Sequence, residues 1–306
     1  MINKKIIIGS RGSKLALNYA ERAKNEICTK LNIKEKNLEI KKIITEGDKI
    51  KDVRLSDTGG KGLFSKTIEN ELLNNKIDIA VHALKDMPSD ETSGLTTNCF
   101  LERNDPREVL ISRDKKKFND LNKGSIIGTS SFRREFQLKR IRNDLKYKLI
   151  RGNVDTRIKK LNEKNFDAII LSFAGLHSLK LDQNITEIFS TSEIIPSAGQ
   201  GTIALQCREN DEEIIKILKK INHELTYKCV IAERDVLKTL NGDCETPIGA
   251  FANIKNNELN LETELFSLDG KDRFYESLST ELKNFKKIGL KVGTILKKKS
   301  KNSYKR

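Results

Sequence analysis

The segment Lys85-Asp86-Met87-Pro88 places a cation, a carboxylate and a chain stop directly after an apolar run. A carboxyl group delivered by the end of a strand can transfer a proton or stabilise a developing positive charge. An exposed Asp has a pKa of about 3.9, so acid catalysis by Asp86 needs a raised pKa or a proton relayed from the substrate. The competing interpretation is an ion pair between Lys85 and Asp86 that caps a turn.

A second candidate site combines hydroxyl groups with arginines. Thr129 and Ser131 precede a predicted helix, and Arg133 and Arg134 follow at once. A helix N-terminus attracts anions through its dipole and unpaired N–H groups, and Arg binds carboxylate or phosphate through paired hydrogen bonds. The turn therefore predicts anion binding, and the alternative is a simple Ser/Thr cap with surface arginines.

Two more turns repeat this pattern. Arg151 and Arg157 lie six residues apart across a predicted strand-to-helix turn that also holds Asn153. The turn at residues 9–13 holds Arg11 and Ser13. If the three turns face one cleft, they form a receptor for a molecule with several acidic groups. Gln200, in a segment that crosses between predicted domains, is a further binding candidate.

Cys244 lies in a segment with loop composition, residues 241–247, so its thiol is expected to be accessible. The five cysteines are odd in number and lack a CxxC pair, which argues against a disulfide framework and a structural zinc site. His82 is predicted to be a satisfied interior histidine, and no metal site is predicted. Three other cysteines are interpreted as buried structural thiols: Cys28, Cys207 and Cys229.

The composition is that of a multi-domain globular protein. The chain has 306 residues, of which 37% are hydrophobic and 33% charged, and its apolar runs are too short for a signal peptide or a membrane span. Of the net charge of +15, the last ten residues, Lys297–Arg306, supply +6 and are predicted to be a frayed, solvated end. Eight of the 16 arginines fall between positions 107 and 157, which suggests a polyanion site, with a basic solvated face as the alternative.

The first two-thirds of the chain alternates strand, loop and helix, which predicts α/β domains with helices on both sheet faces. The Asp78–Leu84 strand is apolar enough to be buried on both faces, as in parallel sheets. The other predicted strands here are Lys5–Ile8, Leu38–Ile44, Ser125–Gly128, Lys148–Ile150 and Asp167–Ser172. The predicted helices here lie within 16–31, 63–73, 131–141 and 154–161.

Three domains are predicted. Residues 1–101 with 202–220 form a discontinuous α/β domain, and 107–195 form a second α/β domain inserted into it. Residues 222–306 form a small α+β domain with an antiparallel sheet, because a helix is followed there by short alternating strands and a last helix. In α/β sheets ligands bind outside the carboxyl ends of the strands, where Asp86 and the arginine turns lie.

Six motifs together resemble one family over residues 6–252. They are Gly9-Ser10-Arg11-Gly12-Ser13-Lys14-Leu15-Ala16-Leu17, Gly59-Gly60-Lys61-Gly62-Leu63-Phe64, Ala80-Val81-His82-Ala83-Leu84-Lys85-Asp86, Gly128-Thr129-Ser130-Ser131-Phe132-Arg133-Arg134, Arg151-Gly152-Asn153-Val154-Asp155-Thr156-Arg157 and Gly242-Asp243-Cys244. In this order they are similar to the motifs of the porphobilinogen deaminase (hydroxymethylbilane synthase) family.

The resemblance implies an enzyme that joins four porphobilinogen units head to tail, with loss of ammonia, on a dipyrromethane primer. By motif position, Cys244 would bind that cofactor through a thioether, and Asp86 would be the catalytic aspartate. The resemblance also implies two periplasmic-binding-protein-like (type II) α/β domains and a third that carries the cofactor loop. The residues that would bind substrate and cofactor are Arg11, Ser13, Lys85, Thr129, Ser131, Arg133, Arg134, Arg151, Asn153, Arg157 and Gln200.

Porphobilinogen is then the substrate, and we expect a cytoplasmic monomer without nucleic acid, membrane or metal partners. Some positions depart from the family pattern. His177-Ser178 stand where an Arg is common, Tyr19 where Gln is common, and Ala83 where Ser is common. These changes put in question details of carboxylate binding, with Lys180 as a possible replacement.

Two other functions compete with this one. A non-catalytic, two-lobed anion-binding protein would explain the α/β domains but not a loop cysteine on a third domain. A nucleic-acid-binding protein would explain the net positive charge, but aromatic residues are only 6%, Trp is absent, and the Phe residues do not alternate with the arginines. An adduct on the intact protein separates the first of these alternatives from the enzyme.

Overall fold

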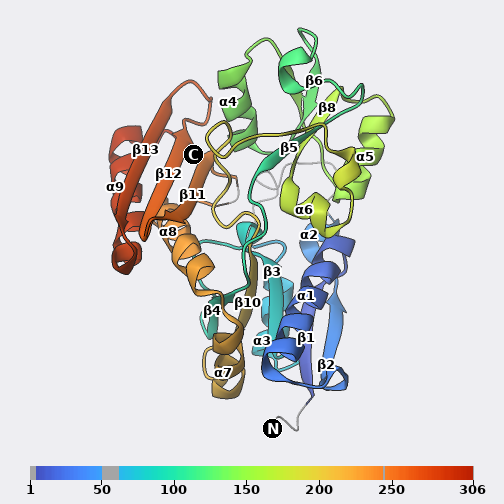
Figure 1. Ribbon diagram of the computed structural model, residues 1–306, viewed down its shortest axis with the longest axis vertical. Helices are drawn as coiled ribbons and strands as arrows, with labels where there is room; N and C mark the ends of the chain where they lie inside the picture. The colour runs from blue at the N-terminus through green and yellow to red at the C-terminus, as the bar shows by residue number, and fades with distance from the viewer. Residues whose placement is uncertain (1–4, 50–61, 244, 306) are drawn as a thin grey trace.

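The computed structural model describes residues 5–49, 62–243 and 245–305, and the strands in these ranges form three sheets (Figure 1). Each predicted domain range encloses one sheet. We therefore propose 1–101 with 202–220 as domain 1, 107–195 as domain 2 and 222–306 as domain 3. In Figure 1 domain 1 lies at the bottom, domain 2 at the top and domain 3 at the left.

Domain 1 is a five-stranded sheet with the strand order β2-β1-β3-β10-β4. Its strands are β1 (Ile6–Arg11), β2 (Leu38–Ile43), β3 (Ile79–Ala83), β4 (Leu95–Phe100) and β10 (Ile203–Arg208). Its helices are α1 (Lys14–Leu31), α2 (Glu46–Lys49), α3 (Lys66–Leu73) and α7 (Glu212–Ile221).

Domain 2 has a sheet with the order β7-β6-β8-β5-β9. Its strands are β5 (Glu108–Ser112), β6 (Ile126–Gly128), β7 (Lys146–Lys148), β8 (Ala168–Ser172) and β9 (Glu187–Ile188). Its helices are α4 (Phe132–Ile141), α5 (Val154–Asn162) and α6 (Phe173–Ser178).

The two sheets share one pattern of parallel and antiparallel pairing. In each, the first three strands in spatial order are parallel and the last two pairings are antiparallel. The sheets are therefore mixed, and β3, expected to resemble a strand of a parallel sheet, has β1 parallel on one side and β10 antiparallel on the other. Hydrophobic clusters cover both faces of each sheet, which confirms the predicted α/β class.

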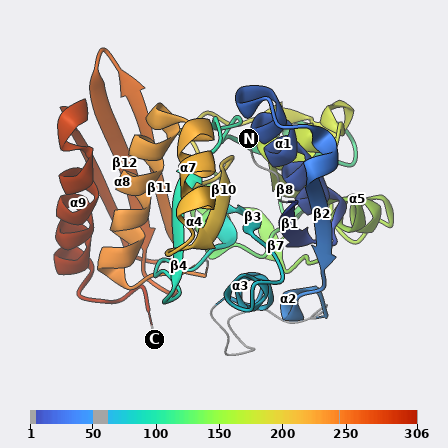
Figure 2. The same cartoon turned by 90° about the horizontal axis from the view of Figure 1, so that it is seen from below.

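Domain 3 packs two helices on an antiparallel sheet. Its elements are α8 (Glu224–Leu240), β11 (Ile248–Lys255), β12 (Glu258–Phe266), β13 (Arg273–Glu281) and α9 (Phe285–Ser300). The helices lie together on one side, and Figure 2 shows them side by side from below. Glycines allow this contact, since a Cβ atom on Gly289 would lie 2.2 Å from the Ala232 carbonyl oxygen. This small α+β domain was predicted.

Helix α1 shows how local sequence places a site residue at the edge of the sheet. The Ser13 hydroxyl accepts the Ala16 N–H as N-cap, and Asn32 ends the helix in the left-handed conformation. Ala23 and Ile27, one turn apart, are fully buried against the sheet. The cap therefore fixes the turn between β1 and α1 at the carboxyl end of the strand.

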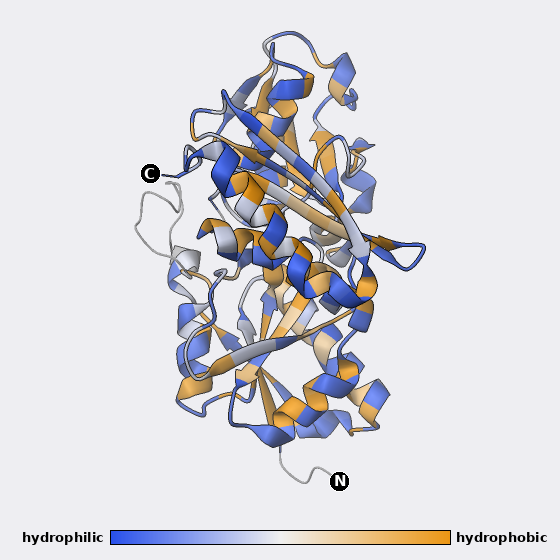
Figure 3. Cartoon of the chain, turned by 90° about the vertical axis from the view of Figure 1, so that its left-hand side faces the viewer, coloured by the Kyte–Doolittle hydropathy of each residue, from blue (hydrophilic) through white to orange (hydrophobic). Residues whose placement is uncertain are grey.

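Two predictions about segments were wrong. The strand predicted at Lys148–Ile150 is β7, Lys146–Lys148, two residues earlier. The C-terminal segment is not frayed, because α9 extends to Ser300 and Tyr304 is only 1% exposed. The Tyr304 hydroxyl donates a hydrogen bond to the Leu240 carbonyl oxygen at 2.9 Å. Figure 3 shows the hydrophobic and hydrophilic residues of this side of the molecule, with the C-terminus close to domain 3.

No helix within the described ranges combines the length and the apolar character needed to span a bilayer. In the same ranges, no group of His, Cys, Asp and Glu side chains is arranged to hold a metal ion. Cys207 and Cys229 are buried free thiols, as predicted, and Cys28 is partly buried.

Candidate active site

A cleft of about 890 Å³ is lined by residues of all three domains. It brings together most of the predicted site residues, although they come from turns far apart in the sequence. Those that line it are Arg11, Ser13, Lys85, Asp86, Ser131, Arg133, Arg134, Arg151, Asn153, Arg157 and Gln200. Thr129 is not among them, because it is buried and its hydroxyl accepts the Ser131 N–H.

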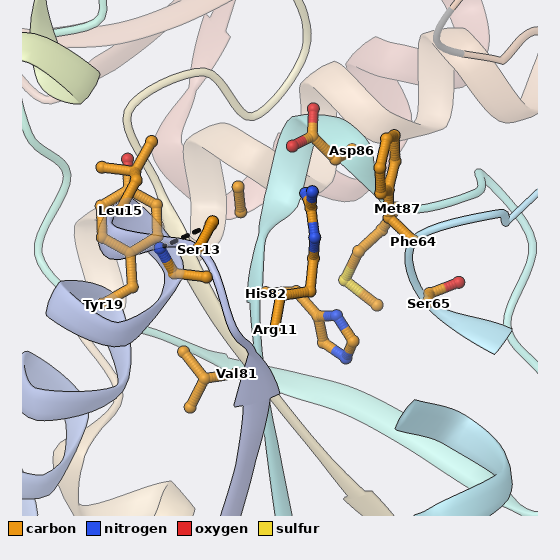
Figure 4. A pocket seen from close by; sticks show the side chains of 12 residues that line it. Arg11, Ser13, Leu15, Tyr19, Phe64, Ser65, Val81, His82, Asp86 and Met87 are labelled. Atoms are coloured by element: carbon orange, nitrogen blue, oxygen red, sulfur yellow. Dashed lines mark hydrogen bonds between the residues drawn. The ribbon is translucent and has the colours of Figure 1, made fainter. Parts of the chain in front are cut away.

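Asp86 reaches the cleft at the carboxyl end of β3. The chain turns there through a short 3-10 helix, Leu84–Asp86, which Met87 closes by donating its N–H to the Leu84 carbonyl. Figure 4 shows the Asp86 carboxyl and the Arg11 side chain beside the Phe64 ring. The Arg11 guanidinium lies 4.0 Å from the centre of that ring. Asp86 is thus held by a rigid strand end in a pocket that also contains a cation and an aromatic face.

Lys85 points into the part of the cleft between the two α/β domains. Its ammonium lies 3.5 Å from Ser172 Oγ and 3.4 Å from Gln200 Oε1. The pKa of Lys85 is lowered to about 8, chiefly by burial and then by the nearby charge of Arg134, against the opposing effect of Asp86. Gln200 is fully buried, and its amide donates to the Pro106 carbonyl, which fixes the oxygen that faces Lys85.

Glu108, a residue that the sequence analysis missed, pairs with both arginines at the start of α4. It is fully buried on β5, and its carboxylate oxygens lie 2.6 Å from Arg133 Nη2 and 2.7 Å from Arg134 Nη2. Arg133 also donates to the Ile195 carbonyl oxygen at 2.9 Å. Arg134 also donates to the Ile170 carbonyl oxygen at 3.2 Å, so each of these two arginines has a second protein partner besides Glu108. The binding role of Arg133 stays a prediction.

The turn before α5 adds two cations, Arg151 and Arg157, and a helix N-terminus without a side-chain cap. Arg157 Nε donates to the Gly152 carbonyl oxygen at 2.8 Å. Burial lowers the pKa of Arg157 to about 10, and the charges of Arg134 and Arg151 add to this effect. Asn153 is the N-cap of α5, but its side chain makes no capping hydrogen bond. The first N–H groups of α5 and these arginines therefore face the same anion-binding region.

Ser13 and Ser131 are the N-caps of α1 and α4 and stabilise the turns before these helices. Each accepts a backbone N–H of the helix that it precedes, from Ala16 and Arg134 respectively. A hydroxyl that accepts in this way still has its own proton to donate to a bound carboxylate. Both serines therefore combine capping with anion binding.

Cys244 lies outside the described residues, but the residues on either side of it line the cleft. Asp243 Oδ1 accepts the N–H groups of Glu245 and Thr246 at 2.9 and 3.1 Å, and Thr246 Oγ1 accepts the Asp243 N–H at 2.9 Å. These bonds tie Asp243 to Glu245 and Thr246. The loop motif Gly59-Gly60-Lys61 also falls outside the described residues, whereas Phe64 lines the cleft.

His82 is the interior histidine that was predicted. It is buried, and its Nε2 lies 3.2 Å from Gln206 Oε1. Burial lowers the pKa of His82 to about 4, so the ring is neutral at pH 7. It lies on β3, the strand that ends at the turn with Asp86.

None of the positions that depart from the family pattern lines the cleft. His177 is exposed and bound to Asp182 at 2.9 Å. Tyr19 is buried in the pocket below Asp86, and its pKa is raised to about 12, chiefly by burial and then by the charge of Asp86. Neither His177 nor Lys180 lines the cleft.

The arginine cluster at 107–157 has two explanations in the structure. Arg134, Arg151 and Arg157 line the cleft. Others hold domain 2 together, since Arg107 pairs with Asp105 and Arg142 with Asp144, both at 2.6 Å. Local ion pairs therefore account for part of the cluster, and the polyanion site stays a prediction. An acid two residues away was the sequence signal for these local pairs.

Two family models match the chain. Residues 6–216 match "Porphobilinogen deaminase, dipyromethane cofactor binding domain", and residues 227–298 match "Porphobilinogen deaminase, C-terminal domain". The chain is 42% identical over 300 residues to a porphobilinogen deaminase of Staphylococcus epidermidis, covering 96% of this chain and 95% of that relative. It is 44% identical over 280 residues to the porphobilinogen deaminase of Bacillus subtilis, covering 90% and 87%.

Among solved structures, the second substrate-binding domain of a putative amino acid ABC transporter from Streptococcus pneumoniae aligns with a TM-score of 0.43 and 15% identity. The alignment covers 71% of this chain and 92% of that chain.

Proposed function

The chain belongs to the porphobilinogen deaminase family, and we propose that its cleft is the active site, with Asp86 as the catalytic acid and Cys244 as the anchor of the dipyrromethane cofactor. As a hydroxymethylbilane synthase, the protein joins porphobilinogen molecules head to tail with release of ammonia and then releases the linear tetrapyrrole. The assignment of these roles to individual residues is the proposal.

The observation that supports it most is the placement of the Asp86 carboxylate among the cations of the cleft. Asp86 lies close enough to Lys85 and Arg157 for its charge to raise the pKa of both. A carboxylate in such surroundings is suited to hold a proton at a leaving amine and to face a pyrrole nitrogen that becomes positive. The other cations of the cleft would bind the acidic side chains of the substrate.

The cleft residues fit a dipyrromethane with acetate and propionate side chains. Lys85, Arg133 and Arg134 bring three cations together around the single carboxylate of Glu108. The remaining positive charge is repulsive, because Arg134 lowers the pKa of both Lys85 and Arg157. Bound carboxylates would relieve this repulsion, and each charge-assisted hydrogen bond would contribute about 1.5–3 kcal/mol. We assign Lys85, Arg134, Arg151 and Arg157 to this task.

When bound, the dipyrromethane supplies the pyrrole carbon to which substrate is joined. In each addition one C–N bond of porphobilinogen and one C–H bond of the terminal pyrrole break, and one C–C bond forms. The proton released from the pyrrole carbon balances the one that ammonia carries away. Asp86 protonates the departing amine, and its carboxylate then stabilises the positive pyrrole nitrogen. Ser13, Ser131 and Arg11 orient the acidic side chains.

The remaining sequence-based assignments stay predictions. They are the binding roles of Thr129, Asn153 and Gln200, the monomeric state and the cytoplasmic location.

Intact mass spectrometry tests the anchor. The purified wild-type protein is expected to be heavier than its sequence by one dipyrromethane, and Cys244→Ala is expected to have the mass of its sequence. Cys28→Ala removes another free, partly buried thiol and should keep the adduct. An adduct on Cys244→Ala, or active wild-type protein without an adduct, would contradict the proposal.

A further inference from the structure

Two hydrogen bonds join the segment after Asp86 to domain 3, one to the loop that contains Cys244 and one from helix α8 before it. Ser89 Oγ donates to the Gly242 carbonyl oxygen at 3.0 Å, and Arg234 Nη2 donates to the Pro88 carbonyl oxygen. Ser89 lies three residues after Asp86, and Gly242 lies two residues before Cys244. The bonds therefore connect the two segments across 153 and 146 residues of sequence. We call Pro88, Ser89, Arg234 and Gly242 the clasp.

Both ends of the clasp are held firmly. On the domain 1 side, Pro88 has a fixed φ and follows the closed turn Leu84–Met87. On the domain 3 side, Gly242 donates its N–H to the Leu237 carbonyl at the end of α8, at 2.8 Å. The next residue, Asp243, exchanges two hydrogen bonds with Thr246. The Gly242 carbonyl oxygen therefore has a defined position, in which it accepts the hydrogen bond from the Ser89 hydroxyl.

Arg234 is suited to its place in the clasp. It extends from α8 and lines the cleft. Burial lowers the pKa of Arg234, and the charges of its acidic neighbours Glu91, Asp235 and Asp90 oppose this effect. A charged donor to a backbone carbonyl makes a stronger hydrogen bond than a neutral donor. Arg234 thereby holds the Asp86 turn from domain 3, while Ser89 holds the Cys244 loop from domain 1.

We propose that Ser89 and Arg234 are positioning residues of the reaction, which fix the Asp86 turn against helix α8 and against the Gly242 backbone, two residues before the proposed cofactor anchor. The inference rests on the proposed function. Three of the four cations assigned to carboxylate binding belong to domain 2 and lie outside the clasp, and the fourth, Lys85, contacts Ser172 and Gln200. Loss of the clasp should therefore slow the chemical step and leave substrate affinity nearly unchanged.

The size of the effect follows from the geometry. A displacement of about 1 Å between reacting groups can slow a reaction by about 100-fold. Ser89→Ala removes one of two bonds, so a smaller fall in kcat of roughly 5- to 20-fold is expected, with KM within about twofold of wild type. Ser89→Thr keeps the hydroxyl and should restore kcat to within about twofold.

The experiment measures porphobilinogen consumption by the holoenzymes of wild type, Ser89→Ala and Ser89→Thr, after intact mass has confirmed the adduct. Thr294→Ala is the matched control, because it removes a hydroxyl that donates to a carbonyl at 2.8 Å on α9, away from the clasp. Arg234→Met gives a second variant, which removes the other donor and keeps an unbranched apolar side chain. It should also lower kcat.

The inference is overturned if Ser89→Ala keeps kcat within about twofold of wild type, or if Ser89→Thr is as slow as Ser89→Ala. A fall in kcat equal to that of Thr294→Ala would also overturn it. These results leave the proposed function intact when the adduct is present. A wild-type protein that is active without the adduct at Cys244 would instead remove the proposed function.

Discussion

Replacement of Glu108 by Gln is expected to lower the free energy of unfolding by about 3 kcal/mol at pH 7. Burial alone would raise the pKa of Glu108, but the charges of Arg134, Arg133 and Lys85 lower it from 4.5 to about 2. At about 1.4 kcal/mol per pKa unit, this shift corresponds to about 3 kcal/mol. Removal of one partner from a buried ion pair has a similar cost of about 3–5 kcal/mol.

The direction of the pKa shift determines how the stability difference between wild type and Glu108→Gln depends on pH. Because the folded-state pKa of Glu108 lies below the unfolded value, its stabilisation is complete at neutral pH. It is lost as the pH falls from about 4.5 toward 2. Glu108→Gln has no such titration. The difference between wild type and variant should therefore shrink to roughly half its neutral value at about pH 3.

Guanidinium unfolding at both pH values measures the effect. The matched control is Glu212→Gln, which breaks an exposed pair with Lys216 at 3.2 Å and should change stability by less than about 0.5 kcal/mol. The reasoning is refuted if Glu108→Gln lies within about 1 kcal/mol of wild type at pH 7. A difference that stays the same at both pH values would refute it as well.

Two further predictions concern the cleft and the C-terminus. Because the pKa of Lys85 is about 8, its charge is lost as the pH rises through that value, so the KM for porphobilinogen should rise above pH 8. Lys85→Arg should show no such rise below about pH 9, and steady-state kinetics with the same KM profile in both proteins would disprove the role of Lys85. Tyr304→Phe removes the hydroxyl that binds the Leu240 carbonyl and should destabilise the protein by about 1 kcal/mol in urea unfolding. The exposed Tyr275→Phe serves as its control, and equal stability of the two variants would contradict the prediction.

The turns that carry the site were predictable because each follows a local pattern. The strand predicted at Asp78–Leu84 is β3, and its buried residues precede a Lys-Asp pair and a Pro that stop it. Ser13 and Ser131 were recognisable as caps, because a hydroxyl residue stands directly before each helical run. These features depend on neighbours within a few residues.

The shift of β7 shows where a local pattern fails. The prediction followed the apolar pair Leu149 and Ile150, but the ladder with β6 uses Lys146–Lys148 at the edge of the sheet. An edge strand exposes its side chains, so apolar character does not mark it. Ile150 is 1% exposed and packs in the core directly after the strand ends.

Contacts between distant segments account for what was missed. In the sequence alone Glu108 is an ordinary residue of a strand, because its partners in α4 lie about 25 residues away. The Ser89 bond to Gly242 crosses 153 residues and joins two domains. The basic run at Lys297–Arg306 suggested a solvated end, and only the packing of Tyr304 against α8 shows otherwise. Such pairs require the tertiary structure.

The most direct test of the central role of Asp86 is the turnover of Asp86→Asn holoenzyme with porphobilinogen. Asn keeps the size of the side chain but cannot transfer the proton, so kcat should fall by about 100-fold or more while intact mass still shows the adduct. Asp114→Asn, at an exposed site on domain 2, should stay within about twofold of wild type. Near-normal turnover by Asp86→Asn would contradict the account and place the proton chemistry on another group.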